Sequence, residues 1–258
     1  MNILAFNSSH RGRNGHSHFL IEKIFQGARK HGVECEEVML RDYNIKPCLA
    51  CGMCHTKQHW LKCIQTDDLE KIYQKFQKAD IIIFSSPAYV FGISSRLKML
   101  LERLLYSTAD VHNIQMSKSG LFFHHIDHSV FSKPFVLLVC CDNLEEETPK
   151  NVISYFKTYS RFMDAPMLGA LVRKSGELSG YGKKPSAYQN YPVLEKIYQA
   201  YETIGEEIAL TKSISKRTQK LANKPLITVP FFNLLKRIPQ FRQKFLEKAR
   251  EVQQKTSQ

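Results

Sequence analysis

The chain has 258 residues, a formal net charge of +13, and 43% hydrophobic, 24% charged and 11% aromatic residues. This composition is typical of a globular protein with a substantial core, and it excludes an intrinsically disordered chain. No apolar run approaches the ~20 residues that span a bilayer, and Met1–Phe6 shows no secretory signal, so we expect a cytoplasmic protein without a transmembrane segment.

The first part of the chain alternates predicted strands and helices. Asn2–Phe6 is predicted as a short buried strand, followed by a polar loop over residues 7–15. Helical spacing of apolar residues predicts a helix over Ser17–Lys30, and Cys35–Leu40 is predicted as a second strand. Another helix is expected after Thr66, whose side chain can cap it.

The alternation continues beyond the cysteine-rich segment. Asp80–Ser85 is apolar on both faces, as in a central parallel strand, and Ser94 is expected to cap the next helix. Residues 106–133 show no steady period and are interpreted as an excursion. Further strands are predicted at 135–141 and 167–172, with helices after Pro149 and over residues 193–210.

This alternation predicts an α/β fold with right-handed crossovers. Five strands in this rhythm fit a flavodoxin-like, doubly wound parallel sheet of order 2-1-3-4-5. We expect this domain over residues 1–210, with a cysteine-rich loop at 46–66 and a basic, helical extension over 211–258. The extension holds 12 Lys/Arg and 2 Asp/Glu, so it carries +10 of the net charge and leaves +3 for the body.

The loop after the first strand is a candidate phosphate site. In an open parallel sheet, ligands bind beyond the carboxyl ends of the strands, and a helix N-terminus attracts anions. The loop lacks the G-x-G-x-x-G and Gly-Lys-Ser/Thr patterns, which disfavours a Rossmann dinucleotide site or an NTPase. Its candidate donors are Ser9, Arg11, Asn14, His16 and Ser17.

The loop after the third strand suits a flat heteroaromatic ring. An aromatic residue, a proline and a glycine offer a stacking face and a close approach to the backbone. The alternative is that Tyr89 and Phe91 only cover the sheet edge. The candidate contacts are Pro87, Ala88, Tyr89, Val90, Phe91 and Gly92.

These two loops resemble those of the NADPH-dependent FMN reductase family over about residues 1–175. The second loop carries the resemblance through Ser85–Tyr89, Gly92–Ser94, Leu97-Lys98 and Glu102-Arg103. The first loop resembles the family's phosphate loop, with Ser8, His10 and His16 as departures. The resemblance implies FMN, with its phosphate in the first loop and its ring against residues 87–92 and the third loop at 141–143. It also implies NAD(P)H as a co-substrate.

Cysteine spacing supplies the sharpest signal. In a reducing compartment, cysteines are metal ligands or redox groups more often than disulfides. Three thiols at x2 spacing can each reach a different iron of one cubane cluster, whereas zinc is more often held by two separated Cys-x2-Cys pairs. The candidate metal ligands are Cys48, Cys51, Cys54 and Cys63. Zinc and unmetallated thiols stay open as alternatives, and Cys35, Cys140 and Cys141 are expected to be buried apolar residues.

The cysteine pattern resembles the iron–sulfur flavoproteins, which implies a 4Fe–4S cluster. The leading hypothesis is an FMN-dependent oxidoreductase that relays electrons between FMN and this cluster. A flavin needs positioning more than acid–base side chains, so no catalytic residue is nominated. The resemblance also implies a dimer or tetramer and a ferredoxin-like or small-molecule electron partner.

Two other functions remain as hypotheses. One is a cluster-free NAD(P)H-dependent reductase of flavin, quinones or nitro compounds. The other is a zinc-stabilised module whose basic tail binds nucleic acid, against which the nearly neutral body argues; no specific nucleic acid is expected.

The C-terminal extension interleaves apolar and basic residues. It suits an anionic membrane surface, an acidic protein partner or non-specific nucleic-acid binding. Its apolar residues are numerous enough to need covering, so we expect the extension to pack on its own body or on a second subunit. The apolar positions are Phe231, Leu234, Leu235, Ile238 and Phe245, and the basic ones include Lys236, Arg237, Arg242, Lys244 and Lys248.

Overall fold

The computed structural model describes residues 1–228 and 230–256. Five parallel strands form one sheet in the order β2-β1-β3-β6-β7, which confirms the predicted order 2-1-3-4-5 because β4 and β5 lie outside this sheet. The central pairs are in register, with Ala5 opposite Ile83 and Ser85 opposite Leu138. The strands are β1 (Asn2–Asn7), β2 (Glu34–Met39), β3 (Ile81–Pro87), β6 (Phe135–Cys140) and β7 (Met167–Arg173).

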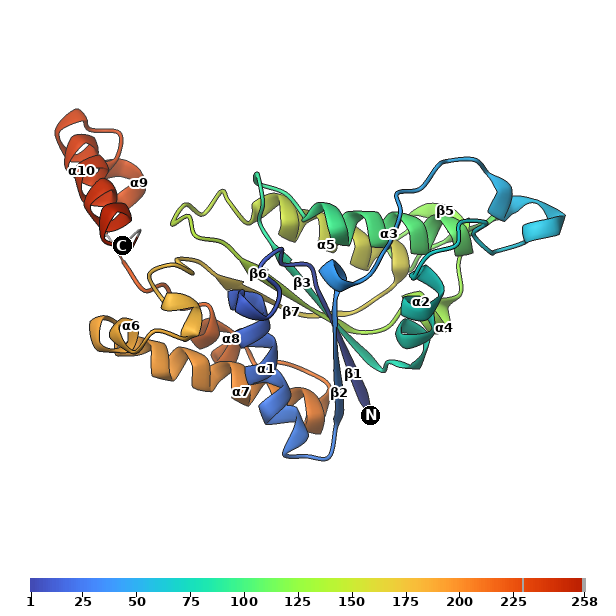
Figure 1. Ribbon diagram of the computed structural model, residues 1–258, viewed down its shortest axis with the longest axis horizontal. Coiled ribbons are helices and arrows are strands. Elements are labelled where there is room, and N and C mark those ends of the chain that lie inside the picture. Colours follow the sequence, from blue (N-terminus) through green and yellow to red (C-terminus); the bar gives the residue numbers. More distant parts are fainter. Residues whose placement is uncertain (229, 257–258) are drawn as a thin grey trace.

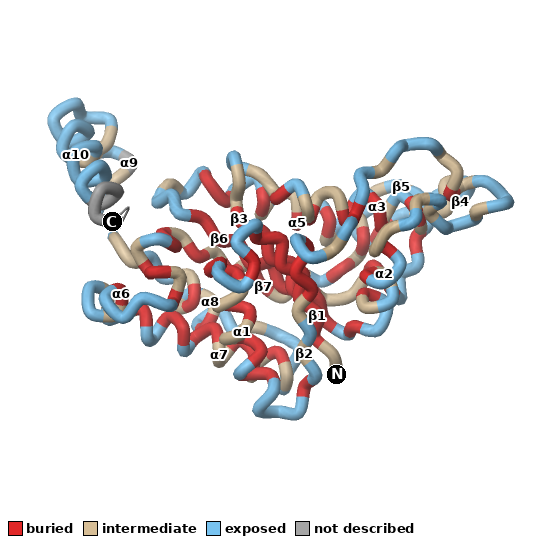
Figure 2. Tube along the Cα trace, in the orientation of Figure 1, coloured by how far each residue is buried: buried red, intermediate tan, exposed pale blue. Residues whose placement is uncertain are grey.

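Helices cover both faces of the sheet, as Figure 1 shows. One face packs against α2 (Leu69–Lys78), α3 (Ser95–Thr108), α4 (His128–Phe131) and α5 (Lys150–Met163). The other packs against α1 (His16–Arg29), α6 (Pro185–Asn190), α7 (Val193–Thr211) and α8 (Lys216–Ala222). Buried residues therefore concentrate along the sheet and the inner faces of the helices (Figure 2).

The helices α1 and α7 cross at two glycines. A Cβ atom on Gly27 would lie 1.9 Å from the carbonyl oxygen of Glu202, and one on Gly205 would lie 1.9 Å from that of Ile24. Only glycine permits backbones this close. The crossing fixes α1, whose N-terminus follows the first predicted loop.

The helix caps agree with the prediction at one position and differ at another. The Ser94 hydroxyl accepts a hydrogen bond from the Leu97 amide at 3.4 Å, so Ser94 caps α3 as predicted. The prediction for Thr66 is wrong, because α2 begins at Leu69 and the Leu69 amide donates to Asp67 Oδ1. The Asp67 carboxylate is a stronger acceptor than the Thr66 hydroxyl for a helical amide.

Residues 106–133 complete α3 and then form an antiparallel hairpin, β4 (Asp110–Met116) and β5 (Phe122–His125), followed by α4. The hairpin exposes apolar side chains, so its sequence lacks the alternation of a half-buried strand. The Trp60 ring stacks on His112 with 5.5 Å between ring centroids, which joins the hairpin to the cysteine-rich loop.

The C-terminal region is helical, as predicted. Its first part packs on the body, because the Asn223 side chain accepts from the Val172 amide at 2.8 Å and donates to the Ala170 carbonyl at 2.9 Å. Beyond it, α9 (Phe232–Leu235) and α10 (Pro239–Thr256) stand away from the body (Figure 1). Residues 229 and 257–258 of the predicted extension lie outside the described residues. No helix in the described ranges combines the length and apolarity needed to cross a membrane.

Candidate cofactor sites

The two predicted loops meet at one cavity of about 310 Å³ beyond the carboxyl ends of β1, β3 and β6. Two predicted residues do not line it: Asn14 is exposed in the short 3-10 helix Gly12–Asn14, and Gly92 closes the neighbouring turn. The predicted residues that line it are Ser9, Arg11, His16, Ser17, Pro87, Ala88, Tyr89, Val90 and Phe91.

The first loop presents a helix N-terminus to the cavity. The helix α1 starts after Gly15, which offers no capping side chain, so amides of its first turn are available to a ligand. A Cβ atom on Gly15 would lie 2.7 Å from Ser9 Oγ, so a larger residue would displace the Ser9 hydroxyl. The loop is therefore narrow and rich in donors.

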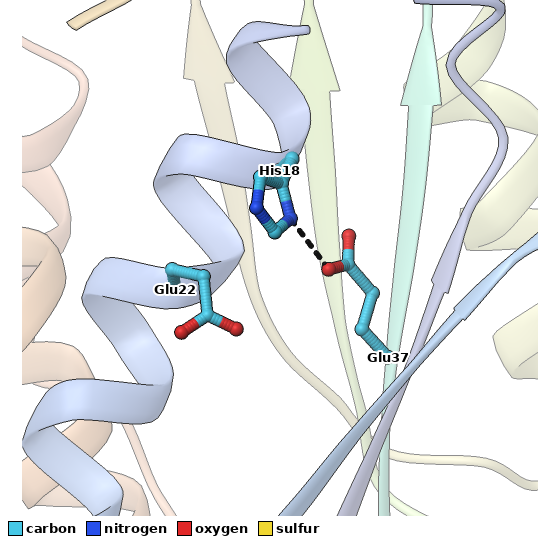
Figure 3. A group of neighbouring side chains, drawn as sticks. All are labelled: His18, Glu22 and Glu37. Carbon is cyan, nitrogen blue, oxygen red and sulfur yellow. Dashed lines mark hydrogen bonds and ion pairs between the residues drawn. The ribbon is translucent and has the colours of Figure 1, made fainter. Parts of the chain in front are cut away.

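Side chains behind the loop fix its start. Asn7 is fully buried, and its Oδ1 accepts a hydrogen bond from the Ser9 amide at 2.9 Å. Its Nδ2 donates to Glu37 Oε1 at 2.7 Å. The other Glu37 oxygen lies 2.6 Å from His18 Nδ1, and Glu22 faces the pair from α1 (Figure 3). Glu37 is thus satisfied by two partners and holds Asn7 in place.

His16 is a neutral side chain in this site. Burial, together with the charge of Arg173, lowers the pKa of His16 to about 3. Its Nε2 lies 3.2 Å from the Tyr198 hydroxyl, whereas Nδ1 is buried without a hydrogen-bond partner among the described residues. His16 therefore offers a hydrogen bond and no positive charge, and Arg11 is the cation of this loop that lines the cavity.

The second loop contains a strained turn. The Gly92 amide donates to the Tyr89 carbonyl at 3.1 Å, and the two central residues, Val90 and Phe91, have φ values of 46° and 63°. A β-branched residue at positive φ is a conformational outlier, and such outliers concentrate at functional sites. Val90 is 90% exposed and Phe91 58% exposed, so neither side chain is held by the core. The Tyr89 ring stacks on His10 at the edge of the cavity.

Sequence reasoning missed one side of the cavity. Besides the expected third-loop residues Cys141, Asp142 and Asn143, the lining includes Cys140, Thr148, Gly176 and Tyr181. The Arg11 guanidinium lies 4.3 Å from the centre of the Tyr181 ring, so the loop after β7 closes over the first loop. The run of glycines at 176, 180 and 182 was the available signal. Burial raises the pKa of Cys140 to about 12, which keeps that thiol protonated.

The four predicted metal ligands line a second, small cavity of about 20 Å³. Gly52 adopts a φ of +66° and lets the chain turn between the cysteines. The Ala50 amide points to the sulfur of Cys48, with 3.4 Å between the two atoms. The lining cysteines are Cys48, Cys51, Cys54 and Cys63.

A buried ion pair closes the base of the cysteine loop. Arg103 and Asp67 are both buried and lie 2.8 Å apart. Arg103 also donates to the Lys46 carbonyl at 2.6 Å and to Cys63 Sγ at 3.3 Å, so it joins both ends of the loop to α3. Burial alone would raise the pKa of Asp67, but hydrogen bonds from Arg103 and two backbone amides lower it overall. This carboxylate is therefore ionised at neutral pH.

Two proteins of known type are similar in sequence to part of this chain. An iron-sulfur flavoprotein of Methanocaldococcus jannaschii is 34% identical over 103 residues, which cover 40% of this chain and 51% of the relative. One of Archaeoglobus fulgidus is 37% identical over 103 residues, covering 40% and 48%. The matched part thus spans about half the length of these relatives.

Solved structures share the fold. An FMN-dependent NADH-azoreductase from Bacillus anthracis superposes with a TM-score of 0.57 at 13% identity, covering 81% of this chain and 99% of that one. An azoreductase from another strain of Bacillus anthracis gives a TM-score of 0.52 at 15% identity, covering 87% of this chain and 100% of that one. Residues 1–139 match the family described as NADPH-dependent FMN reductase, and the chain belongs to that family.

Proposed function

We propose that this protein is an FMN-dependent oxidoreductase that passes electrons between FMN and a 4Fe–4S cluster, with NAD(P)H as a co-substrate. The observation that carries the proposal is the presence, in one chain, of a cavity lined by both loops of the FMN type and a second cavity lined by four thiols. Bound FMN accepts an electron pair and releases electrons singly, which a nearby cluster is suited to relay.

The first cavity fits FMN through the chemistry of its lining. Ser9, Ser17 and the amides of the first turn of α1 supply neutral donors for a phosphate, and Arg11 supplies the charge. Residues 87–91 supply apolar walls for the ring, and residues 141–143 supply polar and backbone groups. The unpartnered Nδ1 of His16 is a buried polar atom in this lining that a ligand can satisfy.

The spacing of the four cysteines favours a cluster over a single zinc ion. Three thiols at x2 spacing can each bind a different iron of one cubane, whereas zinc takes all its thiolates on one atom. The Arg103 hydrogen bond to Cys63 adds the kind of outer contact that orients metal ligands.

Exposed apolar side chains support a homo-oligomer. Ile114 and Phe122 on the β4–β5 hairpin are 73% and 74% exposed, and the hairpin lies against the cysteine-rich loop. Monomers rarely leave such side chains together in water. We therefore propose a dimer or tetramer in the cytoplasm, with a ferredoxin-like protein or a small molecule as the electron partner.

Anaerobic purification tests the proposal, with a visible spectrum, flavin extraction and analysis of iron, sulfide and zinc. We expect FMN together with about four iron and four sulfide per chain. Cys51→Ser should lower the iron content and leave FMN bound, whereas Cys35→Ser, outside both cavities, should change neither. FMN without iron would indicate the cluster-free reductase. A colourless protein that contains zinc would contradict the whole proposal.

A further inference from the structure

The segment after residue 224, here called the C-terminal arm (residues 225–256), presents apolar side chains to water. Throughout residues 241–251 of α10, only Phe245 is partly buried, and it packs on Phe232 with 5.2 Å between ring centroids. The arm therefore covers part of its apolar surface internally and leaves the rest outside. Most of its trace is coloured as exposed in Figure 2. The exposed apolar residues are Phe231 (79%), Leu234 (62%), Ile238 (39%), Phe241 (40%) and Leu246 (47%).

Two side chains of the arm contact the body: Leu226 packs against the core at the start of the arm, and Lys236 forms an ion pair. Lys236 Nζ lies 2.6 Å from Glu145 Oε2, on the loop between β6 and α5. Next to this ion pair, a groove of about 460 Å³ separates the arm from residues 144–146 and 174–175. The first part of the predicted extension thus packs on the body, as Asn223 shows, whereas the arm beyond Leu226 contacts the body at Glu145. Packing of the arm on a second subunit stays a prediction.

The positive charge of the arm indicates which kind of partner its exposed apolar side chains can bind. Residues 231–251 hold six Lys/Arg and two Asp/Glu. Four of these cations pair with no carboxylate among the described residues, namely Arg237, Arg242, Lys244 and Arg250. A second copy offers a body of charge +3, which repels the arm, and a nucleic acid would leave the exposed phenylalanine and leucine side chains in water.

We infer that the C-terminal arm binds the surface of an anionic lipid membrane. On α10, the exposed side chains of Phe241 and Leu246 are interleaved with those of Arg242, Lys244 and Lys248. This arrangement lets the exposed apolar side chains of the arm enter the headgroup region while the cations contact lipid phosphates. The helix has 18 residues and lies in the plane of the surface.

Vesicle sedimentation of the purified full-length protein tests the inference. We expect binding to phosphatidylcholine vesicles that contain about one quarter phosphatidylglycerol to be at least about tenfold tighter than to pure phosphatidylcholine vesicles. High salt should weaken this binding. Arg242→Glu with Lys244→Glu should reduce it by about tenfold or more, and Phe241→Ser with Leu246→Ser should reduce it while the net charge is unchanged.

The matched control reverses two charges on the body. Arg217 and Lys220 are exposed on α8, which packs against the sheet, so Arg217→Glu with Lys220→Glu changes the net charge by the same amount. We expect this control to retain most of the binding. Three results would overturn the inference: no binding to anionic vesicles, equal loss in the α8 control, or an oligomer that dissociates when the arm is substituted. Tighter binding to duplex DNA than to vesicles would overturn it as well.

Discussion

Arg103 places a buried positive charge between the two ends of the cysteine loop. Its loss leaves the Asp67 carboxylate buried without its ionic partner. Removal of one member of a buried ion pair is strongly destabilising, whereas exposed pairs contribute little.

We therefore expect Arg103→Ala to lower the free energy of unfolding by about 3 kcal/mol or more, measured by urea denaturation. Lys98→Ala is the matched control, because Lys98 pairs with Glu102 on the exposed side of the same helix. Its expected cost is below about 1 kcal/mol. Equal effects of the two substitutions would show that the buried pair is not what stabilises the loop.

The turn between Tyr89 and Gly92 is the element in which local sequence and backbone disagree most. Left-handed backbone costs an ordinary residue about 1–2 kcal/mol, and asparagine tolerates it far better than valine. Since Val90 is 90% exposed, its side chain contributes no packing that offsets this cost.

Val90→Asn should therefore raise the free energy of unfolding by about 1 kcal/mol, measured on the cofactor-free protein. Val90→Ala keeps the left-handed penalty of an ordinary residue and should gain less. If the asparagine variant is no more stable than the natural chain, the turn is not strained.

At the scale of the whole molecule, His16 makes folding sensitive to acid. Its pKa is about 3 in the folded protein and near 6.5 in an unfolded chain. Between pH 6.5 and pH 3, His16 is protonated in the unfolded chain and neutral in the folded protein. The free energy of unfolding is therefore highest above pH 6.5 and decreases as the pH falls.

The expected slope from this one group is up to about 1.4 kcal/mol per pH unit, measured by urea denaturation at pH 6.5 and pH 5. His16→Phe should make the loss of unfolding free energy between these two pH values smaller by up to about 2 kcal/mol. His31→Phe is the control, because His31 is exposed and should leave the slope unchanged. A His16→Phe protein with the slope of the natural chain would contradict the assignment.

The sheet could be predicted because its strands are short apolar runs between amphipathic helices. This pattern is visible in the sequence without any knowledge of tertiary contacts. The hairpin within residues 106–133 could not be predicted, since Ile114 and Phe122 are exposed. Its sequence therefore lacks the alternation of apolar and polar residues that indicates a strand. Both FMN-type loops could be found from their own residues. Tyr181 could not be found in this way, because its position beside Arg11 depends on the path of the loop after β7 in three dimensions. The Arg103–Asp67 ion pair joins residues 36 positions apart, so no local sequence pattern predicts it.

The glycine crossing of α1 and α7 sets an order of events during synthesis. The helix α1 emerges early from the ribosome, but α7, which covers Leu20, Ile21 and Ile24, begins only at Val193. Until α7 has been translated, the first helix lacks its cover, and the turn that precedes it lacks firm support. We therefore expect the first loop to take its final shape, and to bind the proposed FMN, only after α7 has been translated.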